Sequence, residues 1–277
     1  MKKYQKLLLS AFAFSFIILS CQRVPLTGRK QLVGLVSQDA MLKMAFTEYK
    51  SFVDTSKVVP VRNRDAAMVS RVGSRIKNAV ETYLIQNNYS KVIDGYQWEF
   101  TTVQNNQINA WAMPGGKVCF YTGILPICQN DEGVAVVMGH EIAHAIASHG
   151  RERMSRAMAA QGVTQAGAVL AGVATGNESM MQTAGQVLGI LAPVGFVLPN
   201  SRNQESEADK LGTIFMAMAG YDPRVAVDFW KRMAEASKGQ QKPPLLLSTH
   251  PSDERRISEL EQMMPKAMKY YQAYGNR

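Results

Sequence analysis

Apolar side chains recur every three or four positions along much of the chain beyond residue 38, the spacing of one helix face. The first predicted helix has Asp39 as its N-cap and runs to about Val53. Pro60 separates it from a second helix, capped by Asp65. In this second helix the apolar residues at helical spacing are Met68, Val69, Val72, Ile76, Val80 and Tyr83. These stripes predict the buried faces of core helices.

Three shorter stretches have the composition of strands, and they lie at 98–103, 110–112 and 117–121. Pro114-Gly115-Gly116 predicts a turn between the last two. Helical patterns then return at 136–149, 205–219, 224–236 and 253–260. The expected fold class is therefore α+β, mainly helical, with one small sheet.

The composition predicts a single domain and argues against nucleic acid as a partner. The 277 residues are 46% hydrophobic, which suits one domain over 21–277 with a sizeable core. The formal charge of +9 includes three lysines in the first 20 residues. Without them it is 28 − 22 = +6. No basic cluster with interleaved aromatic residues is present, so nucleic acid binding is not expected, whereas weak attraction to anionic lipid is.

Residues 1–20 have the features of a lipoprotein signal peptide. Lys2, Lys3 and Lys6 precede an apolar run at 7–19, and Ile18-Leu19-Ser20-Cys21 is typical of a lipobox, in which Cys21 carries the lipid. Gln22 follows, which favours the outer membrane. We therefore expect a lipid-anchored protein of the bacterial cell envelope that faces the periplasm. Labelling with palmitate that is lost in Cys21→Ser tests this expectation.

The chemistry concentrates in 136–149, which contains three of the four histidines. His140-Glu141-Ile142-Ala143-His144 is an HExxH pattern, and two histidines four residues apart lie on one helix face, where both can bind one ion. Glu141 is rotated by about 100° from His140 and can reach a water without ligating the metal. HExxH alone also occurs by chance in core helices.

Two positions compete for the third ligand. His149 is nine residues after His140, so on a continuous helix it faces the opposite side and is expected to cap the helix C-terminus. Glu205 and Asp209 share a helix face, and Glu207 points away. We expect Glu205 to bind the metal and Asp209 to accept the free N–H of a ligating histidine. Alone, these acids would also suit a solvated helix start.

Together, HEIAHAIASH at 140–149 and SRNQESEADKLG at 201–212 resemble the gluzincin family of HtpX-type and CAAX prenyl proteases. The resemblance spans most of the chain beyond the leader, also includes 109–116 and 248–251, and is nearest to the lipid-anchored, soluble branch. It implies a zincin-like metallopeptidase with one Zn²⁺ bound by His140, His144 and Glu205, and Glu141 as general base. It also implies that Asn109, Ala110, Trp111 and Ala112 form an edge strand for the substrate. An internal hairpin without substrate contact is the alternative.

The expected function is that of a zinc endopeptidase acting on misfolded or unassembled envelope proteins. The alternative is a chaperone or assembly factor whose protease site is regulated or nearly silent. Residues 154–199 form a flap-like or partner-contacting segment in this interpretation, because glycines and Pro193 interrupt their apolar runs. His250 or Arg255 is expected to stabilise the oxyanion or cap the metal. Cys119 and Cys128 could form a disulfide or remain buried thiols, and the sequence does not decide between the two.

Overall fold

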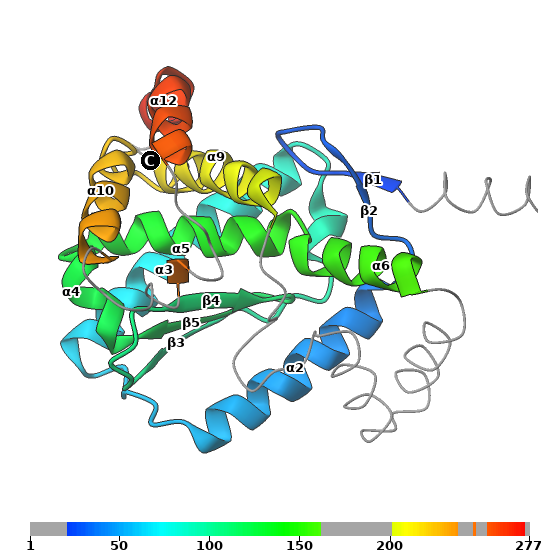
Figure 1. The fold of residues 1–277 in the computed structure, drawn as a ribbon, viewed down its shortest axis with the longest axis horizontal. Coiled ribbons are helices and arrows are strands. Elements are labelled where there is room, and N and C mark those ends of the chain that lie inside the picture. Colours follow the sequence, from blue (N-terminus) through cyan, green and yellow to red (C-terminus); the bar gives the residue numbers. More distant parts are fainter. Residues whose placement is uncertain (1–20, 162–200, 238–245, 248–253, 275–277) are drawn as a thin grey trace, which may run out of the picture.

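The computed structural model describes residues 21–161, 201–237, 246–247 and 254–274. Its centre is helix α5 (Asp131–Ile146), which lies between α9 and the sheet (Figure 1) and is buried from Gly133 to its end. Asn130 caps this helix, because its side chain accepts a hydrogen bond from the Gly133 N–H. Helix α9 (Arg202–Met218) packs along one side of α5, and α3 (Arg64–Gln86) and the sheet cover other sides.

The main sheet has three strands, β3 (Glu99–Val103), β4 (Ala110–Met113) and β5 (Lys117–Tyr121), in the order β3-β5-β4. The central strand β5 is parallel to β3 and antiparallel to β4. Val118 and Phe120 of β5 face the α3 and α5 side, and the alternate residues Cys119 and Tyr121 pack with α2 (Gln38–Thr55) on the other side. Both faces of the sheet are thus covered by helices.

The remaining elements pack around this centre. The first described residues form a two-stranded hairpin, β1 (Cys21–Arg23) and β2 (Lys30–Leu32), and η1 (Ser90–Ile93) precedes the sheet. η2 (Thr122–Ile124) and α4 (Leu125–Cys128) lead into α5, and α6 (His149–Gln161) follows it. Helices α10 (Val225–Ser237) and α12 (Glu254–Tyr274) complete the described chain.

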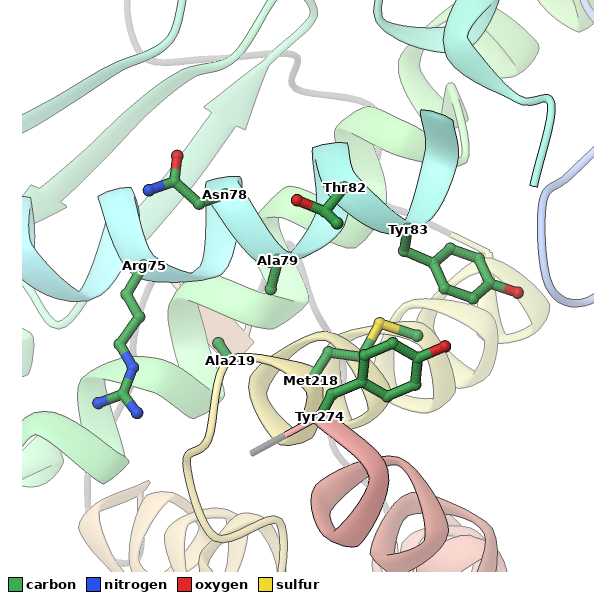
Figure 2. A pocket seen from close by; sticks show the side chains of 8 residues that line it. All are labelled: Arg75, Asn78, Ala79, Thr82, Tyr83, Met218, Ala219 and Tyr274. Carbon is green, nitrogen blue, oxygen red and sulfur yellow. The ribbon is translucent and has the colours of Figure 1, made fainter. Parts of the chain in front are cut away.

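Helix α12 packs mainly on α9, and its last turn approaches α3. A cavity of about 250 Å³ remains between these elements (Figure 2). Its lining residues are Arg75, Asn78, Ala79, Thr82, Tyr83, Met218, Ala219 and Tyr274. None of them is a predicted site residue, so this cavity is separate from the expected chemistry.

The predicted fold class, mainly helical α+β, is confirmed, and the strand predictions differ from the structure by one residue at most. Some helix ends are different. Ser37 rather than Asp39 caps α2, Asn63 rather than Asp65 caps α3, and α12 continues far past residue 260 to Tyr274, with Pro265 inside it. None of the described helices has both the length and the apolar character needed to cross a bilayer.

Two further predictions concern the cysteines and the segment 154–199. Cys119 and Cys128 are buried and free, so the disulfide that the sequence left open does not form. Burial raises the pKa of Cys128 to about 12 and that of Cys119 further, so both remain thiols. Of the segment 154–199, Met154 and Met158 pack into a small apolar cluster as part of α6. Residues 162–199, the larger part of the expected flap, lie outside the described residues.

Helices α5 and α9 approach each other at two glycines, and this contact generates a prediction. A Cβ on Gly212 would lie 2.6 Å from the His140 backbone N and 2.7 Å from the Gly139 carbonyl carbon. We expect Gly212→Ala to lower the free energy of unfolding by about 1–3 kcal/mol in urea denaturation, because the helices must move apart.

Gly150→Ala is the matched control, since its Cβ would have no neighbour nearer than 3.7 Å. It should keep or slightly raise stability. If Gly212→Ala were as stable as the wild type, the helices would not touch at this point.

Candidate metal centre

Two helices bring three side chains together at a buried point. Helix α5 carries His140 and His144 one turn apart, and α9 carries Glu205 in its first turn. Ser201 and Gln204 fix the start of α9 as a capping box, which sets where its first turn points. The three residues are 1–8% exposed, and their ligand atoms all lie within 4.8 Å of one another.

The distances fit a metal ion. His140 Nε2 lies 3.0 Å from His144 Nε2, and Glu205 oxygens lie 3.3 Å from His140 Nε2 and 3.4 Å from His144 Nε2. Ligands bonded at 2.0–2.1 Å in tetrahedral geometry would be about 3.3–3.4 Å apart. Two imidazoles and one carboxylate, all buried, therefore have both the donor chemistry and the spacing of a site that can hold a divalent metal.

Glu141 lies beside this set on α5 and is only 2% exposed. A carboxylate that directly follows a ligating histidine points to a different side of the helix from both histidines. Two arginines face this region: Arg256 of α12, whose Nη1 lies 3.3 Å from a Glu205 oxygen, and Arg153 of α6, whose pKa is raised by Glu205, Glu152 and Glu141. Burial is the larger effect and lowers the Arg153 pKa to about 10.

The other ring nitrogen of His140 contacts Asp209. His140 Nδ1 is 3.0 Å from Asp209 Oδ1, the contact expected from the four-residue spacing of Glu205 and Asp209. Arg256 of α12 holds the same carboxylate from the other side through Nε and Nη2 at 2.6 and 2.7 Å. Its guanidinium lies 3.7 Å from the centre of the Trp230 ring on α10. Three helices thus fix the orientation of one imidazole.

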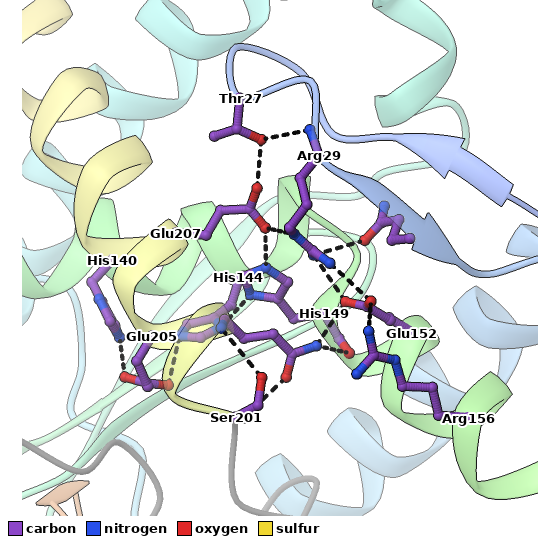
Figure 3. A network of polar contacts seen from close by, with 12 residues as sticks. Thr27, Arg29, His140, His144, His149, Glu152, Arg156, Ser201, Glu205 and Glu207 are labelled. Atoms are coloured by element: carbon purple, nitrogen blue, oxygen red, sulfur yellow. Dashed lines mark hydrogen bonds and ion pairs between the residues drawn. The ribbon is translucent and has the colours of Figure 1, made fainter. Parts of the chain in front are cut away.

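His144 is held by a longer chain of contacts (Figure 3). Its Nδ1 lies 2.7 Å from Nδ1 of His149, and Nε2 of His149 lies 3.0 Å from Glu207. If Nε2 of His144 binds a metal, its Nδ1–H donates to His149, which then donates through Nε2–H to Glu207. Glu207 also accepts hydrogen bonds from Thr27 and Arg29, which lie between β1 and β2.

Arg29 joins two buried carboxylates at the end of this chain. Its Nε donates to Glu207 at 2.6 Å, and both terminal nitrogens donate to Glu152 at 2.9 Å. Although burial lowers the pKa of Arg29, these hydrogen bonds raise it overall. Burial raises the pKa of Glu152 and Glu207, but hydrogen bonds outweigh it and hold both below the usual value. Those bonds come from Arg29 and Gln204 for Glu152, and from His149, Thr27 and Arg29 for Glu207. The network is therefore charged and paired throughout.

The two histidine ligands have different electrostatic environments. Burial lowers the pKa of His140, but hydrogen bonds to Asp209 and Glu205 outweigh it and raise the pKa to about 9. Burial, together with the neighbouring His140 and His149, puts the pKa of His144 well below its usual value, against the effect of Glu205. His144 is thus neutral at pH 7, and a metal ion would take the place of the proton on His140.

Comparison with known proteins agrees with this chemistry. The model of peptidase family M48 matches residues 71–264, which is more than half of the chain. The chain belongs to peptidase family M48. The predicted gluzincin resemblance is thus confirmed at the level of the family, and so is the predicted enzyme class, a metalloendopeptidase.

Similar M48 relatives include two yeast proteins and one bacterial protein. The mitochondrial metalloendopeptidase OMA1 of Schizosaccharomyces pombe is 32% identical over 88% of this chain and 66% of its own length. That of Saccharomyces cerevisiae is 30% identical over 98% and 76%. The β-barrel assembly-enhancing protease of Yersinia pestis is 30% identical over 58% of this chain and 33% of its own length. The chain thus spans only part of each relative.

These relatives contradict the predicted location. Two proteins that align with 88% and 98% of the chain are named as mitochondrial, and the bacterial relative aligns with 58%. The expectation of a bacterial outer-membrane protein was therefore wrong. It rested on the four-residue motif before Gln22, and such a short motif is read by the export machinery of a particular organism and carries no information on its own about which organism that is.

The structure corrects two predictions about the M48 site. His149 does not face away from the histidine pair, because α5 ends at Ile146 and Ser148 adopts a positive φ of 52° before α6 begins. Arg255 is not the arginine at the site. Its side chain is 66% exposed and bonds to Glu259, whereas Arg256 is buried between Asp209 and Trp230. His250 lies outside the described residues.

Several residues at the M48 site were not predicted. Only for Arg256 does the sequence contain a pattern that could have indicated its position. Along α12, Arg256, Leu260 and Ala267 recur at 4 and 7 residues and are all buried, so the helical period places Arg256 on the inner face. Arg29 and Glu152 are far from the motifs in sequence, and no local pattern indicates that they meet. Glu207 was predicted only to point away from the face of Glu205 and Asp209, and its contact with His149 was not predicted.

The contact between the N-terminal hairpin and His144 can be tested with two neighbouring substitutions. We expect Arg29→Met to weaken divalent metal binding by up to about tenfold, because it releases Glu207 and then His149, and His149→Phe to weaken it by about 10–100-fold. Lys30→Met, at the next position of the hairpin, which is exposed, should bind as the wild type does. Metal affinity is measured by competition with a chelating dye. Equal affinity of Arg29→Met and Lys30→Met would show that the hairpin does not support the site.

Proposed function

We propose that this chain is a zinc-dependent endopeptidase that hydrolyses polypeptides. Its zinc ion would be bound by His140, His144 and Glu205. The observation that carries the proposal is the set of three buried ligand atoms whose separations match a tetrahedral site. When bound, a zinc ion supplies Lewis acidity toward the peptide carbonyl and toward water. The yeast relatives, whose names describe metalloendopeptidases, support the same activity.

Glu141 is the general base in this proposal. It takes a proton from the attacking water and delivers it to the nitrogen of the leaving amine, so one carboxylate serves both steps. Burial beside the histidine pair keeps Glu141 within reach of the reacting water while His140 and His144 hold the metal. Asp209 and His149 support the activity indirectly, since each bonds the second ring nitrogen of one ligand.

The experiment compares casein digestion by the wild type and Glu141→Gln. We expect the variant to lose about 10²–10⁴-fold in rate, because it removes a general base, and to keep its zinc. Glu261→Gln, at an exposed position of α12, is the control and should digest normally. A zinc-loaded wild type that digests no unfolded protein but prevents its aggregation would favour the chaperone or assembly function instead.

We further propose that β4 binds the substrate by strand addition. Only its neighbour β5 pairs with it among the described strands, so β4 is an edge. The Tyr121 N–H donates to the Asn109 carbonyl, so by the alternation of antiparallel pairs the backbone groups of Ala110 and Ala112 point outward. Ile108, on the same outward register, already accepts a bond from Leu246. An extended peptide can continue this pattern beside the ligand helix.

Recognition through backbone groups favours substrates with exposed extended segments, which misfolded or unassembled proteins provide. Ala112→Pro tests this idea, because it removes an outward N–H at an edge position that tolerates proline. We expect KM for an unfolded substrate to rise about tenfold with zinc content unchanged. Ala112→Val, which keeps the N–H, is the control. A normal KM in Ala112→Pro would mean that substrate does not pair with β4.

A further inference from the structure

Another cavity, lined mostly by polar residues, lies where the N-terminal hairpin meets the junction of α5 and α6. Its volume is about 400 Å³, within the range of small-molecule sites. The hairpin, α2, η1 and the α5–α6 junction all contribute. The lining residues are Gln22, Arg23, Pro25, Gln31, Gln38, Lys91, Val92, Ile146, Ser148 and Arg151.

The charge of this cavity has one sign. Arg23, Lys91 and Arg151 line it, and no aspartate or glutamate does. None of the three cations forms an ion pair with a described residue. By contrast, the half-buried Arg29 and the buried Arg256 each hold a carboxylate.

Arg151 gives the strongest indication of a ligand, because it is only 9% exposed. Its Nε donates to the Val36 carbonyl at 2.7 Å, which leaves the four N–H groups of its terminal nitrogens without a described acceptor. Burial lowers its pKa, with only Tyr96 opposing this, so no carboxylate offsets the cost of burying the charge. Burial of a guanidinium without a carboxylate costs free energy, and an anion bound in the cavity would offset that cost.

Arg23 and Lys91 add positive charge to the cavity on long side chains. Arg23 donates one hydrogen bond to the Gly28 carbonyl at the exposed turn of the hairpin, and Lys91 lies in η1. Arg75, which lines the cavity between α3 and α12 (Figure 2), instead lies 4.7 Å from the centre of the Tyr221 ring. The cavity at the hairpin thus combines three cations, one of them buried, with no carboxylate in its lining.

We propose that this cavity binds the phosphate group of an anionic ligand, with Arg151 as its buried contact and Arg23 and Lys91 at its opening. A planar guanidinium matches two phosphate oxygens, and the flexible side chains close over the remaining charge. A phospholipid headgroup and a soluble phosphate ester offer the same phosphate chemistry, and the experiment separates the two sources.

Binding is measured by calorimetry on the full chain in a non-ionic detergent. The titrants are inorganic phosphate, glycerol 3-phosphate, dihexanoyl phosphatidylglycerol and, as a lipid without net charge, dihexanoyl phosphatidylcholine. We expect the wild type to bind at least one anionic titrant and not phosphatidylcholine. Preference for phosphatidylglycerol identifies a headgroup site, and equal or better binding of the esters identifies a soluble ligand.

Two double variants that remove the same charge decide whether the cavity is responsible. Arg23→Gln with Lys91→Gln should raise Kd at least about tenfold. Lys50→Gln with Arg224→Gln, at sites 77% and 67% exposed and away from the cavity, should change Kd less than about twofold. Arg151→Lys keeps the charge but loses the planar fork and should also bind more weakly. Equal losses in the two double variants, or no binding of any anion by the folded wild type, would overturn the proposal.

Discussion

The close contact of α5 and α9 is the constraint on which the rest of the structure depends. Without side chains at Gly139 and Gly212, the backbones of the two helices touch, since a Cβ on Gly139 would lie 2.6 Å from the Gly212 carbonyl oxygen. His140 follows one of these glycines, and Glu205 lies two turns before the other. The contact thus brings a carboxylate from one helix to within 3.4 Å of both imidazoles of the other.

Such an arrangement is costly, because it buries three ligands and several further charged groups. The structure offsets this cost by pairing. Arg256 holds Asp209 on the His140 side, and Arg29 holds Glu207 and Glu152 on the His144 side. These arginines come from opposite ends of the described chain. The centre is therefore completed only when the N-terminal hairpin and the C-terminal helix are both in place, which couples its geometry to the folding of the whole domain.

Much of the fold and the centre of the site follow from local sequence patterns. The HExxH spacing places His140 and His144 on one helix face, and the four-residue spacing of Glu205 and Asp209 predicts a contact of Asp209 with a ligating histidine. The direction of the His149 side chain does not follow from the helical spacing, because Ser148, with its positive φ, separates α5 from α6 just before it. Contacts such as Arg29 with Glu152, which join distant segments, have no local signal and require the tertiary structure.

The zinc content of purified protein shows whether His140, His144 and Glu205 together bind one metal ion. We expect about one zinc per chain in the wild type and in Glu261→Ala, and loss of most of it in Glu205→Ala. The Glu261 side chain is exposed on α12 and forms an ion pair with Lys231, so its removal controls for the loss of a carboxylate. Full zinc content in a folded Glu205→Ala variant would contradict the ligand set.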